Sequence, residues 1–456
     1  MKKFIKNNWR RASLILTLVF FFLAGSSEQK TSAQSSNCDC VPNEVIFELR
    51  VPANLAAVAA QYKLIPTPLG QVGTPPTYRM LIDVLQTSQT SQQIVTAMQS
   101  DARITKPELN RKLSAAEREG LSWTLGRSWS IGRSWSIGGS AKGYAKQWFP
   151  EKIRLSEAHN SPQGSRGAGV IIAVLDTGID LTHPAFAGKL VAGYDFVDDD
   201  NNPSEVGVLR QNPSYGHGTH VAGIVALTAP DAKIMPLRVL NSNGEGELWR
   251  VTQAIIWATS NGAKIANISF GYPDNVDLLK DLIDCTNVGT TPDGKTFSEI
   301  GANRLAIVAG AGNGGNASPI YPAAEDLNGM LGVGASTRND LLASFSTYDR
   351  AWVEVTAPGE NIVSALPGGR YGVWSGTSMS APIVSGIAAL VKSKYPQLTI
   401  PHDLLDQVKE TSLDIRYNQG AIRLHRVDAL CAVMNTQPCP IPPTPAGNAG
   451  FENFGL

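Results

Sequence analysis

Residues 170–178 of the chain read VIIAVLDTG, and this stretch decides the fold class. Six successive apolar residues leave no polar face, which is typical of a central parallel strand that is buried on both sides. Five later stretches have similar strand character, with helical stretches such as residues 248–260 between them. These strand candidates are residues 233–240, 264–270, 305–309, 330–335 and 353–357. The alternation predicts an α/β fold with a doubly wound parallel sheet, whose functional site lies beyond the carboxyl ends of the strands.

The composition is that of a globular protein with balanced charge. The chain has 456 residues, 43% of them hydrophobic, and 39 basic side chains offset 39 acidic ones. It is too long for one average domain and apolar enough for a large core. Since a nucleic-acid or membrane-surface protein needs a basic excess, the composition excludes both classes.

Residues 1–26 predict a signal peptide. A basic start precedes an uncharged apolar run at residues 14–24, which is shorter than the ~20 residues of a membrane span. We expect cleavage after Ser26, with cleavage after Ala33 as the alternative and a retained membrane anchor as the competing interpretation. No later segment is long and apolar enough to span a bilayer. The chain is therefore expected to be secreted or periplasmic, without stable membrane insertion.

Three further regions accompany a main domain at residues 150–435. Residues 38–110 alternate strands and helices in the order β-α-β-α-β, which suggests a small ferredoxin-like unit. Residues 111–149 hold three copies of a hexapeptide, SWTLGR, SWSIGR and SWSIGG at 122–139, whose glycines favour a linker. Residues 436–456 form a Pro-rich tail that we expect to be extended.

The five cysteines do not indicate a catalytic or zinc site. Cys38 and Cys40 lack a second ligand pair at metal spacing, and Cys285 stands alone. Cys431 and Cys439 are close enough in sequence to pair if the chain is exported.

Three motifs contain side chains that could take part in a reaction. Asp176 follows the apolar strand directly, His217 opens the run HGTHVAG, and Ser378 lies in GTSMSAP before a helix of small residues. Alone, each has an ordinary alternative: a turn aspartate, a metal or structural histidine, a helix cap. Of the two histidines we choose His217 as a base, because it stands at a loop-to-helix junction, and we expect His220 to be structural.

Together the three motifs indicate nucleophilic catalysis. A serine hydroxyl is a weak nucleophile until a base takes its proton, and a carboxylate must hold that base in one tautomer. The order Asp, His, Ser is the one found in subtilisin. A lipase or esterase would need Gly-x-Ser-x-Gly and the order Ser, acid, His, so that class is excluded.

The chain resembles the subtilisin-like serine proteases over about residues 147–430. The resemblance implies a serine endopeptidase with a triad of Asp176, His217 and Ser378. It also implies that Asn313, in AGAGN at 309–313, donates its amide to the oxyanion. Two walls would bind a polypeptide substrate as an added strand, with Leu248 lining a pocket. The wall residues are Ser269, Phe270 and Gly271 on one side and Gly244, Glu245 and Gly246 on the other.

By the same resemblance, residues 38–110 would be an inhibitory propeptide that binds its own chain. The protein would then be a zymogen that cuts itself, and the hexapeptide repeats are an accessible stretch for the cut. Two other interpretations stay open: a maturation protease that cuts few partners, and an inactive member that only binds peptides.

The chemistry itself needs no cofactor, but a structural calcium ion is possible. Ala185 and the short stretch 228–232 depart from the family's strong calcium site, which we predict to be absent. The acidic loop at 195–202 resembles another calcium loop of the family. Its candidate ligands are Asp195, Asp198, Asp200 and Asn202, and a solvated loop without metal is the alternative. The longer stretch 274–303 is a second departure whose role stays open.

Overall fold

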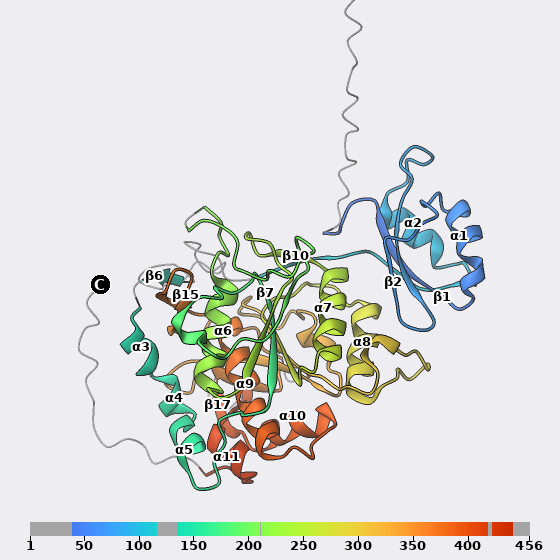
Figure 1. Cartoon of the computed structure of the whole chain (residues 1–456). Coiled ribbons are helices and arrows are strands. Elements are labelled where there is room, and N and C mark those ends of the chain that lie inside the picture. Colours follow the sequence, from blue (N-terminus) through green and yellow to red (C-terminus); the bar gives the residue numbers. More distant parts are fainter. Residues whose placement is uncertain are drawn as a thin grey trace, which may run out of the picture. The chain divides into compact units, whose positions relative to one another are not determined.

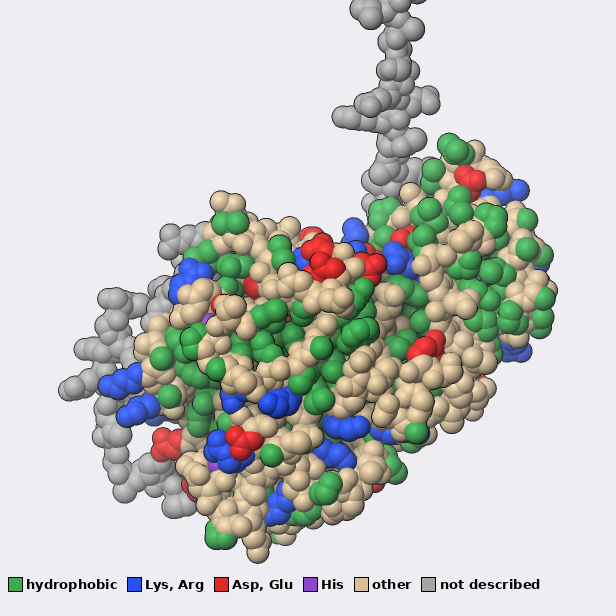
Figure 2. All heavy atoms as spheres, in the orientation of Figure 1, with side chains coloured by type: hydrophobic (Ala, Val, Ile, Leu, Met, Phe, Trp, Pro, Cys, Tyr) green, Lys and Arg blue, Asp and Glu red, His purple; other side chains and the backbone are tan. Residues whose placement is uncertain are grey.

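The computed structural model describes residues 39–115, 135–137, 139–209, 211–349, 351–417 and 422–440. The expected signal peptide, the first two hexapeptide copies and most of the Pro-rich tail lie outside these residues. Within the described ranges, no helix is both long and apolar enough to cross a membrane. On the face drawn in Figure 2, basic and acidic side chains both occur.

A nine-stranded sheet forms the centre of the larger domain (Figure 1). Its strand order is β17-β18-β14-β13-β12-β11-β7-β9-β8, and every pair is parallel except the edge pair β17–β18. The strands are β7 (Ile171–Asp176), β8 (Tyr194–Asp195), β9 (Lys233–Arg238), β11 (Ile265–Ile268), β12 (Ala306–Gly310), β13 (Met330–Ser336), β14 (Val355–Pro358), β17 (Leu413–Tyr417) and β18 (Ile422–Arg426). The predicted parallel α/β sheet is confirmed, and each predicted strand falls on one of these.

Helices cover both faces of this sheet. Ile172 and Val174 of β7 pack in the same core cluster as α6 and α9, while Ala173 and Leu175 pack in the cluster of α7 and α8. This two-sided burial explains why the strand is apolar at every position. The helices of this domain are α3 (Ala141–Ala145), α4 (Phe149–Lys152), α5 (Leu155–Asn160), α6 (His217–Thr228), α7 (Leu248–Ser260), α8 (Asp277–Val288), α9 (Thr377–Lys394), α10 (Pro401–Glu410) and α11 (Ala429–Met434).

The N-terminal unit is a second, smaller sheet with two helices. Its elements are β1 (Glu44–Leu49), α1 (Leu55–Gln61), β2 (Gly70–Val72), β3 (Thr77–Leu81), α2 (Ser91–Met98) and β4 (Ile104–Glu108). The sheet is antiparallel in the order β2-β3-β1-β4. The order β-α-β-β-α-β is typical of ferredoxin-like units. It contains one strand, β2, that the sequence did not indicate, because three residues are too few to show an alternation.

The predicted linker contributes strands to the larger domain. β5 (Lys112–Ser114) pairs with β10 (Glu245–Glu247), and β6 (Trp135–Ile137), from the third hexapeptide copy, pairs with β16 (Arg370–Trp374). β15 (Ile362–Leu366) completes the second of these small sheets. The third copy therefore belongs to a sheet and is not free linker.

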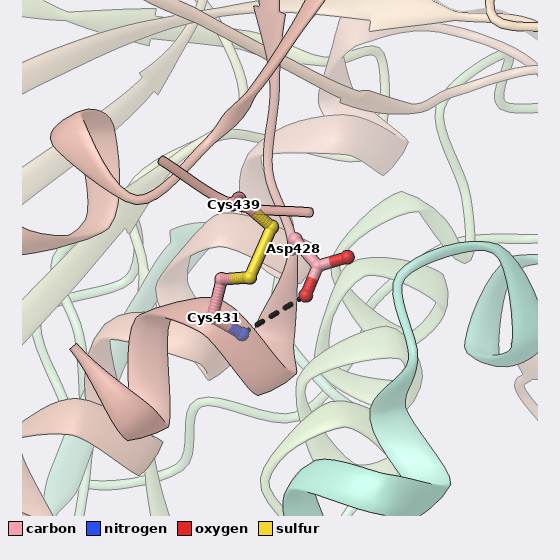
Figure 3. Close-up of side chains that lie close together, drawn as sticks. All are labelled: Asp428, Cys431 and Cys439. Atoms are coloured by element: carbon pink, nitrogen blue, oxygen red, sulfur yellow. Dashed lines mark hydrogen bonds between the residues drawn. A yellow bond between two sulfur atoms is a disulfide. The ribbon is translucent and has the colours of Figure 1, made fainter. Parts of the chain in front are cut away.

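Cys431 and Cys439, which are close enough in sequence to pair, form a disulfide (Figure 3). It ties the first turn of α11 to the segment that follows the helix, and the Asp428 carboxylate caps the same turn by accepting the Cys431 N–H at 3.0 Å. Cys40 is also disulfide-bonded, whereas Cys285 is a buried free thiol.

Candidate active site

Asp176 is the last residue of β7 and is fully buried. Its Oδ1 accepts a hydrogen bond from the Thr177 N–H at 2.8 Å and lies 2.7 Å from Nδ1 of His217. An ionised carboxylate can only accept, so the imidazole proton sits on Nδ1. The other ring nitrogen, Nε2, is then the one that can act as a base.

Two glycines let His217 reach this carboxylate. A Cβ atom on Gly218 would lie 2.1 Å from the Gly178 carbonyl oxygen and 3.0 Å from the Asp176 Cβ, so no side chain fits there. Gly216, at the N-cap of α6, has a φ of +96°, in the left-handed region that favours glycine. The helix therefore begins in contact with the end of β7.

His220 lies apart from Asp176, inside the domain. Its ring stacks on Trp374 with centroids 5.0 Å apart, and its Nε2 is 3.3 Å from the Gly372 carbonyl oxygen. Burial lowers the pKa of His220 to about 3, so the ring is neutral near pH 7. The centroid of the Trp374 ring also lies 5.2 Å from that of the His217 ring, so both histidines pack against the same indole. No sequence pattern indicated Trp374 apart from its position just before GTSMSAP.

Ser378 stands in the first turn of α9 and is 3% exposed. Its Oγ donates to the Ser269 carbonyl oxygen at 2.9 Å, and the Ser269 hydroxyl donates to the Ser378 carbonyl oxygen at 3.2 Å. First-turn N–H groups have no partner within the helix and carry partial positive charge. The Ser380 hydroxyl donates instead to the Ala357 carbonyl oxygen, which is a packing role.

Asn313 follows β12 and is held next to the start of α9. Its Oδ1 accepts from the Thr377 N–H at 2.9 Å and from the Thr377 hydroxyl at 3.2 Å. Because these bonds occupy the oxygen, the Nδ2 amide is the part of the side chain that can donate. The Asn313 amide thus belongs to the same small region as Ser378.

The two predicted substrate walls lie on either side of a strand of the chain itself. β5 pairs antiparallel with β10 on one side. On this same side the Ala115 N–H donates to the Gly244 carbonyl oxygen at 2.8 Å. On the other side Ser114 and Gly271 exchange two backbone hydrogen bonds of 3.3 Å. Residues 112–115 thus occupy the groove as an added strand.

A buried pocket receives the side chain of Leu113. Leu113 is 2% exposed and belongs to one apolar cluster with Leu240 and Leu248. A Cβ atom on Gly246 would lie 2.7 Å from Leu240 and 3.4 Å from Leu113. Gly246 therefore packs directly against Leu240, and Leu113 lies in contact with the same part of β10.

The acidic loop is organised around an arginine. Arg238 Nη1 lies 2.6 Å from Asp195 Oδ2 and 2.5 Å from Asp198 Oδ2. Asp195 Oδ1 accepts two backbone N–H groups of the loop, and Asp200 Oδ1 accepts the Asn202 N–H at 2.8 Å. Calcium needs six to eight oxygen ligands. Since Arg238 already pairs with two of the four predicted ligands, Asp195 and Asp198, these residues do not fit calcium as they are arranged.

One other group of acids and cysteines converges among the described residues. Asp428, Cys431 and Cys439 place ligand atoms within 4.8 Å of one another. The two sulfurs are bonded to each other, so this group is a capped disulfide and not a metal site.

Comparison with known proteins places the larger domain in a family. The model of the subtilase family matches residues 167–426. A thermophilic serine proteinase from Bacillus sp. (strain AK1) is 38% identical over 56% of this chain and 58% of its own length, so the match spans little more than half of that relative. Thermitase from Thermoactinomyces vulgaris is 37% identical over 55% of this chain and 83% of its own.

The fold extends over more of the chain than these matches. The crystal structure of fervidolysin from Fervidobacterium pennivorans, described as a keratinolytic enzyme related to subtilisin, has a TM-score of 0.66. It covers 89% of this chain and 63% of that one at 23% identity. This likeness shows a shared fold that includes more than the larger domain.

Replacing Arg238 with methionine is expected to destabilise the protein by about 3 kcal/mol or more, because it leaves the buried Asp195 carboxylate without its charge partner. Chemical denaturation measures this loss. We expect a calcium chelator to leave the wild-type melting temperature unchanged, and added calcium to stabilise Arg238→Met only. A chelator effect on the wild type that disappears in the variant would place a cation in this loop instead.

The pH dependence of stability should carry a signature of His220. The pKa of His220 is lowered on folding. Between pH 6.5 and about 3, the histidine is therefore protonated in the unfolded chain and neutral in the folded chain. That contribution to stability is fully present above the unfolded pKa near 6.5 and is lost progressively as the pH falls toward about 3. In His220→Asn, the melting temperature should fall less steeply between these values than in the wild type. Parallel slopes would contradict the assignment.

Proposed function

Because the chain belongs to the subtilase family of serine peptidases, we propose that it is a secreted endopeptidase, made as a zymogen, that hydrolyses peptide bonds of polypeptides through Ser378. Three residues support this proposal: Asp176 ends β7, His217 begins α6, and Ser378 lies in the first turn of α9, a helix that shares one core cluster with α6. The hydrogen bond of 2.7 Å between His217 and Asp176 is the pairing that a serine nucleophile needs in its base.

In the proposed reaction, Nε2 of His217 takes the proton of the Ser378 hydroxyl as Oγ attacks the substrate carbonyl carbon. Asp176 holds the imidazole in place and stabilises the positive charge that forms on it. The tetrahedral oxyanion accepts hydrogen bonds from the Asn313 amide and from the N–H at the start of α9. His217 then protonates the leaving amine, and water releases the acyl group from Ser378 by the same steps in reverse.

The proposed domains follow the expectations from the sequence. Residues 1–26 would be removed on export, residues 38–110 would act as a propeptide bound in cis, and residues 150–435 would form the peptidase domain. The disulfide between Cys431 and Cys439 supports an oxidising compartment. Nothing in this reaction requires calcium.

The observation that carries self-processing is the strand at residues 112–115. It joins the N-terminal unit to the rest of the chain, and it lies in the groove where a substrate would bind. A peptide that already pairs with both walls pays little further entropy to reach the nucleophile. The chain would therefore be its own first substrate.

The register of this strand indicates which bond is cut. Ser114 pairs antiparallel with Gly271, so each step forward from Ser114 corresponds to a step back from Gly271. If the register of Ser114 were continued, position 116 would correspond to Ser269, whose carbonyl oxygen accepts the Ser378 hydroxyl. We expect cleavage between Ala116 and Glu117, ahead of the hexapeptide repeats and not within them.

Wild-type protein should release an N-terminal fragment and leave a chain that begins at Glu117, as N-terminal sequencing or intact mass would report. Ser378→Ala should stay full length in a purified, protease-free system. Ser380→Ala is a matched control that should still cut, because that hydroxyl only packs against Ala357. Identical shortening of Ser378→Ala would refute self-processing.

Asn313→Ala should slow self-cleavage by about 10²–10³, the loss in kcat known for removal of the oxyanion donor in subtilisin. The rate of appearance of the fragment measures it. Asn316→Ala, at an exposed asparagine nearby, should cut at the wild-type rate. An unchanged rate in Asn313→Ala would remove that residue from the proposed mechanism.

A further inference from the structure

The segment 274–303 contains a buried lysine that the proposed reaction does not use. Lys295 is 2% exposed and follows α8 in this segment. Lysine is almost never fully buried unless it is paired, because removing an ammonium from water is costly. Its partners therefore show what this segment is built to hold.

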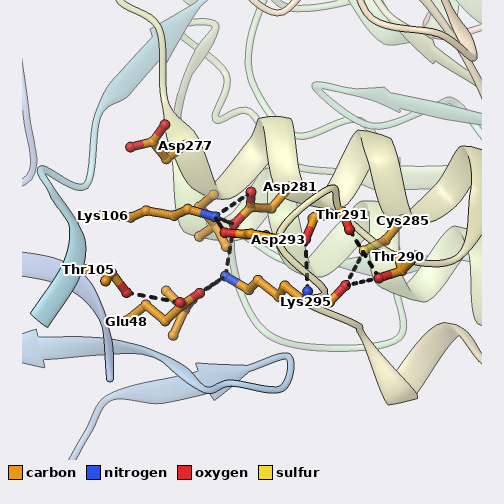
Figure 4. Close-up of polar contacts among 12 residues, drawn as sticks. Glu48, Thr105, Lys106, Asp277, Asp281, Cys285, Thr290, Thr291, Asp293 and Lys295 are labelled. Atoms are coloured by element: carbon orange, nitrogen blue, oxygen red, sulfur yellow. Dashed lines mark hydrogen bonds and ion pairs between the residues drawn. The ribbon is translucent and has the colours of Figure 1, made fainter. Parts of the chain in front are cut away.

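Two of the three partners of Lys295 come from the N-terminal unit (Figure 4). The ammonium lies 2.8 Å from Glu48 Oε2 on β1 and donates to the Thr77 hydroxyl on β3 at 2.6 Å. The third partner, Asp281 Oδ2 on α8, lies 3.1 Å away. The Lys295 ammonium thus contacts two strands of the N-terminal sheet. Of the two carboxylates that pair with it, only Asp281 belongs to the segment.

A lysine of the N-terminal unit, in turn, pairs with acids of segment 274–303. Lys106 on β4 lies 2.9 Å from both carboxylate oxygens of Asp281 and 2.9 Å from Asp293 Oδ2. The two aspartates hold the pKa of Lys106 well above its usual value, so it stays charged. Asp281 is therefore shared between two ammonium groups, one from each side of the contact (Figure 4).

Backbone contacts surround this cluster on both sides. Thr74 and Thr296 exchange two hydrogen bonds, of 2.7 and 3.0 Å. The Glu108 carboxylate accepts the N–H groups of Asp277 and Leu278, at 2.9 and 3.1 Å. α8 has no side-chain cap from its own N-cap residue, so the N-terminal unit completes the start of this helix.

We propose that segment 274–303 is a docking element for the chain's own N-terminal unit, and that Lys295 makes the docking selective for a unit with an acid at position 48. If the unit left, Lys295 would lose Glu48 and Thr77, and Asp281 would lose Lys106. This mutual dependence keeps the unit bound after the chain is cut. The inference rests on the proposed function only in that the bound unit then holds residues 112–115 in the active-site groove as an inhibitor.

The test separates docking from catalysis. In a Ser378→Ala chain, a recognition sequence for an unrelated site-specific protease is inserted within residues 117–134 and cut. Gel filtration over a dilution series then measures how tightly the N-terminal fragment stays with the rest. We expect co-elution, with retention at least about 30-fold weaker in Lys295→Met, as for truncation of one partner of a buried charge pair.

Controls distinguish pairing from general damage. Lys280→Met removes an exposed lysine from α8 and should leave retention unchanged. Glu48→Gln alters only the N-terminal fragment and should weaken retention as Lys295→Met does, which keeps the test open if Lys295→Met does not fold. The double variant should lose less than the sum of the two single losses.

Wild-type retention in Lys295→Met, or strict additivity in the double variant, would overturn the docking proposal. A wild-type chain that never cuts itself would instead refute self-processing and leave this result unaffected.

Discussion

The active-site geometry depends on how closely α6 packs against the carboxyl end of β7. The contact is between backbones, since a single Cβ atom at Gly218 would lie 2.1 Å from the Gly178 carbonyl oxygen. At this separation His217 Nδ1 lies 2.7 Å from Asp176 Oδ1. The packed sheet beneath fixes β7 from both faces, so the position of the carboxylate is set by the core and not by the loop that follows it.

The N-terminal unit contacts helices that cover one face of this parallel sheet. Parallel strands pair residues that are far apart in the chain, and such contacts form slowly. The unit caps α8 through Glu108 and α7 through Asn110, whose Oδ1 accepts the Trp249 N–H at 3.2 Å. These contacts order helices that cover one face of the sheet. They are the kind of contact by which a cis-acting unit would assist folding before it inhibits the groove.

In two clusters of this molecule, buried charged side chains are paired with one another. Arg238 pairs with two acids of the loop in which oxygen ligands for calcium were expected, and Lys295 and Lys106 pair with acids where the N-terminal unit meets the larger domain. In both places a buried ion pair costs desolvation that only full pairing offsets. Stability there rests on specific partners, so removal of one residue should cost more than the number of its contacts suggests.

The sequence by itself determined the sheet, most element positions and the three motifs, because these follow from local periodicity and from residues next to one another. β7 was predicted from its unbroken apolar run, whereas the short spacing of Cys431 and Cys439 allowed a disulfide without assigning it. Tertiary structure alone decided that Arg238 meets Asp195, that residues 112–115 fill the groove, and that Lys295 meets Glu48. Each of these contacts joins distant parts of the chain, and no local pattern encodes which distant charge a lysine or arginine will find once the chain is packed.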